Sequence, residues 1–339
     1  MTQTDISSLD ATALAARVER FRAVREEILS QVGRVIVGQD EVLDQILTAL
    51  LVGGHCLITG LPGTAKTLMV RTIAQTLGLA FSRIQFTPDL MPADITGTDI
   101  IEDDQTTGRR RWTFAPGPLF GNVVLADEIN RTPPKTQSAL LEAMQEHSCT
   151  VRGTVHQLPA PFFVLATQNP IELEGTYPLP EAQLDRFLFN TVLDYLGLEH
   201  ELQVVARTTS TQAATVAAVT SAAELLEFQQ LIRMVPVSDE IARYVVRVVR
   251  ATRFKSEEAP EIIRRYVNYG ASVRAAQFIV LAAKARALAR GRYHVDFDDV
   301  DAYVLPVLRH RILLNFHAQS DRVEADEILR QMLAQAPRG

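Results

Sequence analysis

Hydrophobic residues recur every three or four positions near the start of the chain, which is the spacing of one buried helix face. Val18, Phe21 and Val24 follow this spacing, and a second helix is expected from about 40 to 51. From His55 onward the pattern changes to short apolar runs, several of them continuous, separated by segments long enough for right-handed crossovers. The runs are His55–Thr59, Phe81–Phe86, Asn122–Ala126, Phe162–Thr167 and Phe187–Leu193. This pattern predicts a doubly wound α/β core with a parallel five-stranded sheet.

The strand pattern stops after Asp194, and the rest of the chain has a different character. The stretch 208–221 is rich in Thr, Ala and Ser, which favours a linker, and helical spacing then dominates to the end. Residues 275–289 are rich in alanine, the strongest helix former. We therefore expect three parts, which are an α/β core over 1–195, a linker over 196–223 and an all-helical domain over 224–339.

Composition narrows the class of protein. With 339 residues, 47% hydrophobic and 22% charged, the chain has the composition of a globular protein of about two domains. The predicted core carries 15 Lys and Arg against 23 Asp and Glu, a balance of −8, which argues against a generic nucleic-acid surface. Two cysteines, Cys56 and Cys149, make no disulfide framework, so we expect a reducing, cytoplasmic compartment. No apolar stretch reaches about 18 residues, so no membrane span is expected.

A glycine-rich loop carries the strongest chemical signal. It follows the first predicted strand, precedes a helical run, and reads Gly60-Leu61-Pro62-Gly63-Thr64-Ala65-Lys66-Thr67. Such a loop turns backbone N–H groups toward phosphate, while Lys66 would reach the β- and γ-phosphates and Thr67 would bind Mg²⁺. The usual pattern has glycine where this chain has Ala65, and alanine fits if its φ is negative. A plain strand-to-helix turn with an incidental lysine is the alternative.

Polar residues at the ends of two further strands give the second signal. Asp127 and Glu128 end the run from Asn122, at the sheet edge where open α/β sheets bind ligands. Asp127 would hold Mg²⁺ and Glu128 would polarise an attacking water. Asn169 ends the next strand and could orient that water, although Asn-Pro is also a common turn.

The order of these motifs resembles the AAA+ ATPases, and their wording is similar to the MoxR family in the helix-2-insert branch. The matching segments keep their order from about residue 30 to 310 and are IVGQ, GLPGTAKT, LADEINR, LLEAMQE, ATQNP, EGTYPLPEAQLDRF and GASVRA. In that family alanine before the P-loop lysine is usual. The resemblance implies ATP and Mg²⁺ as cofactors and a C-terminal helical lid on the P-loop core.

The resemblance also implies roles that the residues alone do not. Val37 and Gly38 would line the adenine pocket, and Asn169 would sense the γ-phosphate. Arg186 would be the arginine finger that enters the neighbouring subunit's site, and Arg274 would be a second sensor from the lid. The chain would then form a homo-oligomeric ring, six subunits in the family, that remodels a client or partner protein, often one with a von Willebrand factor A domain.

Two hairpins are expected to interrupt the core. Residues 96–120 contain the acids 102–104, a Thr-Gly turn at 107–108, and Arg109, Arg110, Arg111 and Trp112. Residues 149–158 alternate around Arg152-Gly153, which is typical of a β-hairpin. In the helix-2-insert branch such hairpins approach a central pore. The three arginines are either a solvated tip or a contact for an acidic partner or nucleic acid.

Other functions remain open from the sequence. The second hypothesis within the ATPases is a magnesium chelatase-like motor subunit for metal insertion. A further hypothesis is a DNA-associated ATPase, which the net negative charge of the core disfavours. A scaffold that binds ATP with little hydrolysis is a third class.

Overall fold

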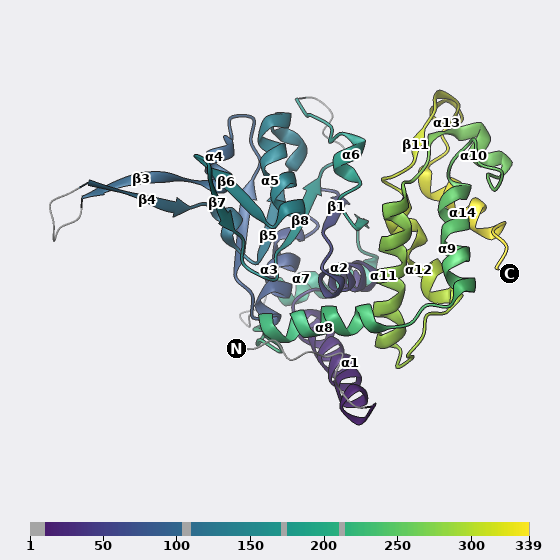
Figure 1. The fold of residues 1–339 in the computed structure, drawn as a ribbon, viewed down its shortest axis with the longest axis horizontal. Coiled ribbons are helices and arrows are strands. Elements are labelled where there is room, and N and C mark those ends of the chain that lie inside the picture. Colours follow the sequence, from purple (N-terminus) through teal and green to yellow (C-terminus); the bar gives the residue numbers. More distant parts are fainter. Residues whose placement is uncertain (1–10, 104–109, 171–174, 210–213, 339) are drawn as a thin grey trace.

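The computed structural model describes residues 11–103, 110–170, 175–209 and 214–338. A five-stranded sheet lies at the centre of the core, with strand order β2-β5-β8-β1-β9 and parallel pairing throughout (Figure 1). The strands are β1 Cys56–Gly60, β2 Phe81–Gln85, β5 Val123–Asp127, β8 Phe163–Gln168 and β9 Phe189–Leu193. Each coincides with one of the five apolar runs, so the predicted doubly wound sheet is confirmed.

Both faces of the sheet are covered, which explains why its strands read as continuous apolar runs. Successive residues of a strand point to opposite faces. Leu125 and Leu165 therefore join one hydrophobic cluster, while their neighbours Val124 and Val164 join another. The first cluster contains helices α1 Ala11–Gly33, α2 Asp40–Val52 and α3 Lys66–Thr76, and the second contains α5 Pro134–Glu146.

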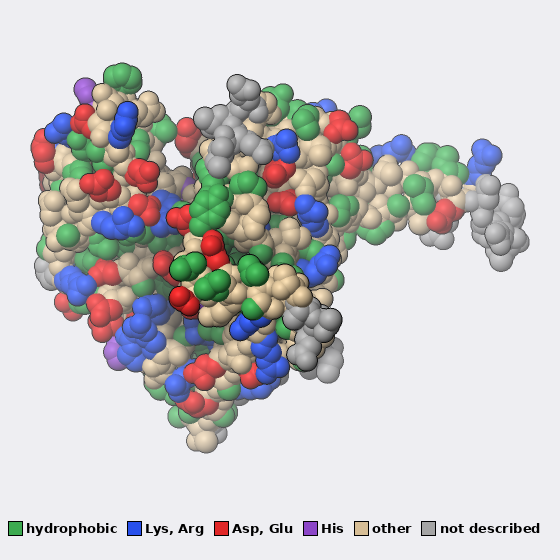
Figure 2. Space-filling model, turned by 180° about the vertical axis from the view of Figure 1, so that it is seen from behind, with side chains coloured by type: hydrophobic (Ala, Val, Ile, Leu, Met, Phe, Trp, Pro, Cys, Tyr) green, Lys and Arg blue, Asp and Glu red, His purple; other side chains and the backbone are tan. Residues whose placement is uncertain are grey.

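Both expected hairpins are present. Strands β3 Gly97–Asp103 and β4 Arg110–Pro116 pair in antiparallel fashion and form an arm that projects from the body of the molecule (Figures 1 and 2). The arm lies between the short helices α4 Pro92–Thr96 and η2 Pro118–Phe120. The predicted turn at 107–108, Asp104 and Arg109 lie outside the described residues. The second hairpin joins β6 Ser148–Val151 to β7 Thr154–Gln157 through Arg152 and Gly153, which both have positive φ.

The second hairpin braces the base of the arm. The guanidinium carbon of Arg152 lies 4.8 Å from the centroid of the Trp112 ring, and its Nε is 4.0 Å from a carboxylate oxygen of Asp99. The His156 ring stacks on Phe114 with centroids 3.8 Å apart. A two-stranded ribbon is marginal by itself, so these contacts stabilise the arm where it leaves the core.

The range 196–223 differs from the predicted linker, because it contains helix α7 Leu198–Thr208. Leu198, Leu202 and Val205 follow helical spacing, but all three are exposed and no residue of α7 is buried. The periodicity was therefore present in the sequence without the burial that usually accompanies it. Helix α8 begins at Ala222, and the domain boundaries at 195 and 224 stay predictions.

The C-terminal part is helical and packs beside the core (Figure 1). Its helices are α8 Ala222–Met234, α9 Asp239–Ala251, α10 Glu261–Tyr266, α11 Val273–Ala289, α12 Phe297–Leu308, α13 Phe316–Asp321 and α14 Ala325–Ala334. A small ribbon of β10 Val267–Tyr269 and β11 Leu313–Leu314 completes it. Helix α2 packs against both α8 and α11, so core and lid share one hydrophobic cluster. Within the described ranges, we find no helix with the length and apolar character needed to cross a bilayer.

Candidate functional site

The sheet topology brings the predicted chemistry to one edge. Strand β8 lies between β5 and β1, with Leu125 opposite Leu165 and Thr59 opposite Gln168. The carboxyl ends of the three strands therefore meet, and the P-loop, the Asp-Glu pair and the polar amide all follow them. This edge is where open α/β sheets bind ligands.

The P-loop is folded tightly against β9 and against itself. A Cβ on Gly60 would lie 2.8 Å from the Cβ of Leu193, so only glycine fits there, whereas Gly63 has φ +80° and faces open space. Lys66 begins α3, and its Nζ donates hydrogen bonds to the carbonyl oxygens of Gly60 at 2.7 Å and Leu61 at 2.9 Å. The loop thus presents the N-terminus of an eleven-residue helix to open space, which suits an anion.

The conformation of Ala65 corrects one expectation. Alanine was expected to fit this position with a negative φ, but the residue has φ 59° and ψ 24°, the left-handed region. A Cβ in this region costs about 1–2 kcal/mol. Position 65 therefore has the left-handed backbone conformation that glycine adopts easily in the usual motif, and in this chain alanine adopts it.

Asp127 is held from two sides at the end of β5. The hydroxyl of Thr167 donates to Oδ1 at 2.6 Å, and Arg83 donates to Oδ2 from Nη2 at 2.7 Å and from Nε at 3.1 Å. Thr167 Oγ1 also accepts the backbone N–H of Glu128 at 2.8 Å, so one hydroxyl aligns both acids. The role of Arg83 was not predicted, because the sequence of β2 does not indicate that Arg83 pairs with Asp127 on the neighbouring strand.

Glu128 occupies a strained backbone and is engaged by two side chains. Its φ is 58°, and a non-glycine residue in this region is a mark of a site held in place by its surroundings. Its Oε2 accepts hydrogen bonds from Gln85 Nε2 at 3.0 Å and Arg131 Nη1 at 2.9 Å. The sequence analysis did not identify Gln85. Gln85 ends β2, and Asn169 directly follows β8, so the rule that identified Asn169, a polar residue at the carboxyl end of a strand, would also have identified Gln85.

A cavity of about 390 Å³ adjoins the P-loop. Val37 lines it, as do Leu68 and Met69 of α3 and residues of α7. Gly38 has φ +67°, and a Cβ there would approach Leu196 to 2.9 Å. The mostly apolar lining suits the flat face of a base.

The donor set fits the nucleotide and the metal that the motif implies. Thr67 and Asp127 offer a hydroxyl and a carboxylate, the oxygen ligands that Mg²⁺ prefers. Among the described residues no group of three or more His, Cys, Asp or Glu side chains could enclose a metal ion.

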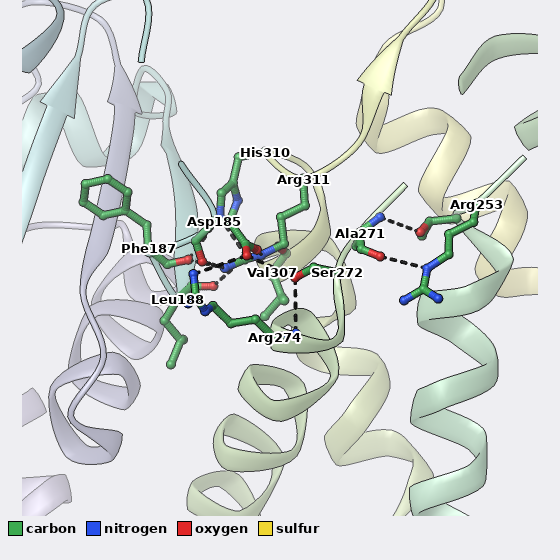
Figure 3. A network of polar contacts seen from close by, with 11 residues as sticks. Asp185, Phe187, Leu188, Arg253, Ala271, Ser272, Arg274, Val307, His310 and Arg311 are labelled. Carbon is green, nitrogen blue, oxygen red and sulfur yellow. Dashed lines mark hydrogen bonds and ion pairs between the residues drawn. The ribbon is translucent and has the colours of Figure 1, made fainter. Parts of the chain in front are cut away.

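Two predicted arginines lie elsewhere. Arg186 follows α6 Glu181–Leu184, and its Nη1 donates to the backbone carbonyl of Leu141 on α5. Arg274 lies in the first turn of α11, with Nη1 3.4 Å from Asp185 Oδ2. Arg274 thus lies beside Asp185 where the lid meets the core (Figure 3), whereas Arg186 is bound to a helix of the core. The cavity beside the P-loop is lined by segments 35–69 and 194–208 instead.

Comparison with known proteins agrees with this geometry. Residues 55–189 match the family model described as "ATPase family associated with various cellular activities (AAA)", and residues 259–332 match the AAA lid domain. A crystal structure described as that of "a putative ATPase from Cytophaga hutchinsonii" is similar to this chain with a TM-score of 0.89 and 40% identity, over 96% of this chain and 98% of that one.

Curated relatives narrow the family further. The chain is 44% identical to Chaperone MoxR1 of Mycobacterium tuberculosis, over 95% of this chain and 83% of that protein. It is 43% identical to YeaC of Bacillus subtilis, over 90% and 92%, and 31% identical to Protein MoxR of Paracoccus denitrificans, over 83% and 86%. The P-loop, the paired acids and the helical lid occur together in one fold, and the curated relatives match nearly the full length of the chain. This chain therefore belongs to the MoxR family of AAA+ ATPases.

Proposed function

We propose that this chain hydrolyses ATP with Mg²⁺ in a homo-oligomeric ring, in which each site is completed by Arg186 and Arg274 of the next subunit. The observation that carries the proposal is the separation described above. The P-loop, Asp127 and Glu128 share the sheet edge, whereas Arg186 is bound to the carbonyl of Leu141 on α5 and Arg274 is paired with Asp185 at the seam with the lid. An arginine finger can be supplied by a neighbouring chain, and the separation of Arg186 and Arg274 from the P-loop favours that arrangement here.

The residues at the edge have roles that follow from their present partners. Bound ATP and Mg²⁺ supply a polarised γ-phosphoryl group, and Lys66, Thr67 and Asp127 would hold them. Lys66 would leave two backbone carbonyl oxygens and bind phosphate oxygens instead. Asp127 would give up its ion pair with Arg83 and bind Mg²⁺ instead. Glu128 would orient the attacking water with Asn169, while positive charge from the neighbour stabilises the transition state.

The ring arrangement also supports a motor function. A head-to-tail contact that joins the arginines of one subunit to the pocket of the next closes cyclically, and six subunits is the number that the family implies. The braced arm would then move with the core as nucleotide turns over. We propose that this motion remodels a client protein, in the sense of the name Chaperone MoxR1, and that a partner with a von Willebrand factor A domain is one candidate.

Mixing two inactive variants tests the shared site. Glu128→Gln removes the water-orienting carboxylate, and Arg186→Ala removes the finger, which is worth about 10³–10⁵ in rate. Each variant alone should bind ATP but release phosphate slowly. In equal mixtures, about a quarter of the contacts in a cyclic ring pair an intact Glu128 with an intact Arg186, so phosphate release should partly return. Absence of recovery in rings shown to contain both variants would overturn the trans assignment.

A further inference from the structure

Arg311 is a buried charge placed where the lid meets the core. It lies between α12 and β11, its side chain is 1% exposed, and it reaches across to the segment that carries Arg186 (Figure 3). Its Nε donates to Asp185 Oδ1 at 2.8 Å and its Nη2 to the Asp185 carbonyl at 2.9 Å. It also donates to three further backbone carbonyls, those of Phe187, Leu188 and Val307.

This arrangement fixes the backbone on both sides of the finger. Carbonyls of residues 185, 187 and 188 all accept from one guanidinium, whose planar fork cannot follow a moving chain without breaking several bonds. Burial lowers the pKa of Arg311 to about 10, although the hydrogen bond that Arg311 donates to Asp185 raises it, so the group is still charged at neutral pH. On the other side, Arg186 itself is bound to Leu141 of α5.

The second oxygen of Asp185 is used differently. Its Oδ2 accepts from the Ser272 hydroxyl at 3.0 Å and from Arg274 Nη1 at 3.4 Å. Ser272 caps the N-terminus of α11, and the Arg274 side chain is 41% exposed, so its guanidinium is accessible from outside the chain. The Asp185 carboxylate therefore binds both the buried Arg311 and the exposed Arg274, and Asp185 directly precedes Arg186 in the chain.

We infer that Asp185 and Arg311 are positioning residues for catalysis in trans. Arg311 fixes the segment that presents Arg186, and Asp185 holds Arg274 beside it, so that a subunit offers both guanidiniums to its neighbour as one unit. This inference rests on the proposed function, because it concerns the arginines that one subunit lends to the next. It predicts that Asp185 matters to the subunit that lends arginines and not to the subunit that binds the nucleotide.

The mixing experiment separates these two roles. In one mixture, Asp185→Asn is added to the Glu128→Gln chain, which lends its arginines to the Arg186→Ala chain. In the other, Asp185→Asn is added to the Arg186→Ala chain, which supplies the working pocket. We expect the recovered kcat to fall about 10- to 100-fold in the first mixture, since a small misplacement of a catalytic group has effects of that size. In the second mixture the recovery should be unchanged, and KM for ATP should stay within about twofold in both.

Asp326→Asn is a matched control. Asp326 accepts two hydrogen bonds from Arg309, at 3.0 and 2.9 Å, elsewhere in the lid. Placed in the lending chain, this change should leave the recovery as it was. Equal losses in both Asp185→Asn mixtures would show a merely structural role, and full recovery in the first would also overturn the inference. If the parent mixture without Asp185→Asn does not recover, the shared site itself is wrong and the inference falls with it.

Discussion

Two Arg–Asp ion pairs of nearly equal length lie in different regions of the molecule. Arg83 pairs with Asp127 at 2.7 Å on the carboxyl edge of the sheet, and Arg311 pairs with Asp185 at 2.8 Å in the seam between core and lid. The Arg83 side chain is 46% exposed and that of Arg311 is 1% exposed. An exposed pair contributes little to stability, whereas removing one partner of a buried pair leaves an uncompensated charge.

The difference shows how the two regions divide their tasks. At the edge, Arg83 and Arg131 bind Asp127 and Glu128 with side chains that are 46% and 44% exposed, so these two arginines can leave when a nucleotide enters. The edge also stores strain, because Ala65 and Glu128 have positive φ, as does Gln39 near the cavity. At the seam, Arg311 is bound by backbone carbonyls as well as by Asp185, so this region serves as the fixed frame.

The largest expected effect compares the two arginines directly. Arg311→Met leaves Asp185 Oδ1 and several backbone carbonyls without the hydrogen bonds that Arg311 donates, and the free energy of unfolding should fall by about 3–5 kcal/mol. Arg83→Met should cost less than this, because the Arg83 side chain is 46% exposed and Thr167 continues to donate a hydrogen bond to Asp127. Urea unfolding followed by far-UV circular dichroism measures both. Equal losses would contradict the division into an exchangeable edge and a fixed seam.

Acid should weaken the core and the seam through one buried imidazole each. Burial lowers the pKa of His55 to about 4, helped by the nearby charge of His147 and opposed by a hydrogen bond to the carbonyl of Met144. Burial, with the charge of Arg311, lowers the pKa of His310 as well. The unfolded chain takes up these protons near pH 6.5, so stability is complete above that pH and falls as the pH drops toward 4.

For His55 the loss of unfolding free energy should reach about 3 kcal/mol, because its pKa is about 4 in the folded chain and about 6.5 in the unfolded chain. The variants His55→Gln and His310→Gln, unfolded in urea from pH 7 to 4, each remove one of these groups. Each should therefore show a shallower decline than the parent chain. A parent chain equally stable at pH 7 and 4.5 would show that neither imidazole is buried as described.

Sequence reasoning succeeded where structure depends on neighbours in the chain. All five strands, both hairpins and the helical lid follow from local hydrophobic patterns, and the P-loop with Asp127 and Glu128 follows from motifs at strand ends. Arg311 could not be found in this way, because its partner Asp185 lies 126 positions away and only packing brings them together. Arg83 was hidden for the same reason, although a polar residue at a strand end made Gln85 visible in principle.

The smallest expected effect concerns Ala65, whose φ is positive where the sequence predicted a negative value. Ala65→Gly removes a Cβ from the left-handed region and relieves about 1–2 kcal/mol, while glycine gains entropy in the unfolded chain that offsets about 0.5–1 kcal/mol of it. The free energy of unfolding should thus rise slightly or stay within about 1 kcal/mol. Ala16→Gly is the matched control, since Ala16 is exposed within α1 and its replacement should cost about 1 kcal/mol. If both glycines destabilise equally, Ala65 is not strained, and the strain we assign to the nucleotide edge would rest on Gln39 and Glu128 alone.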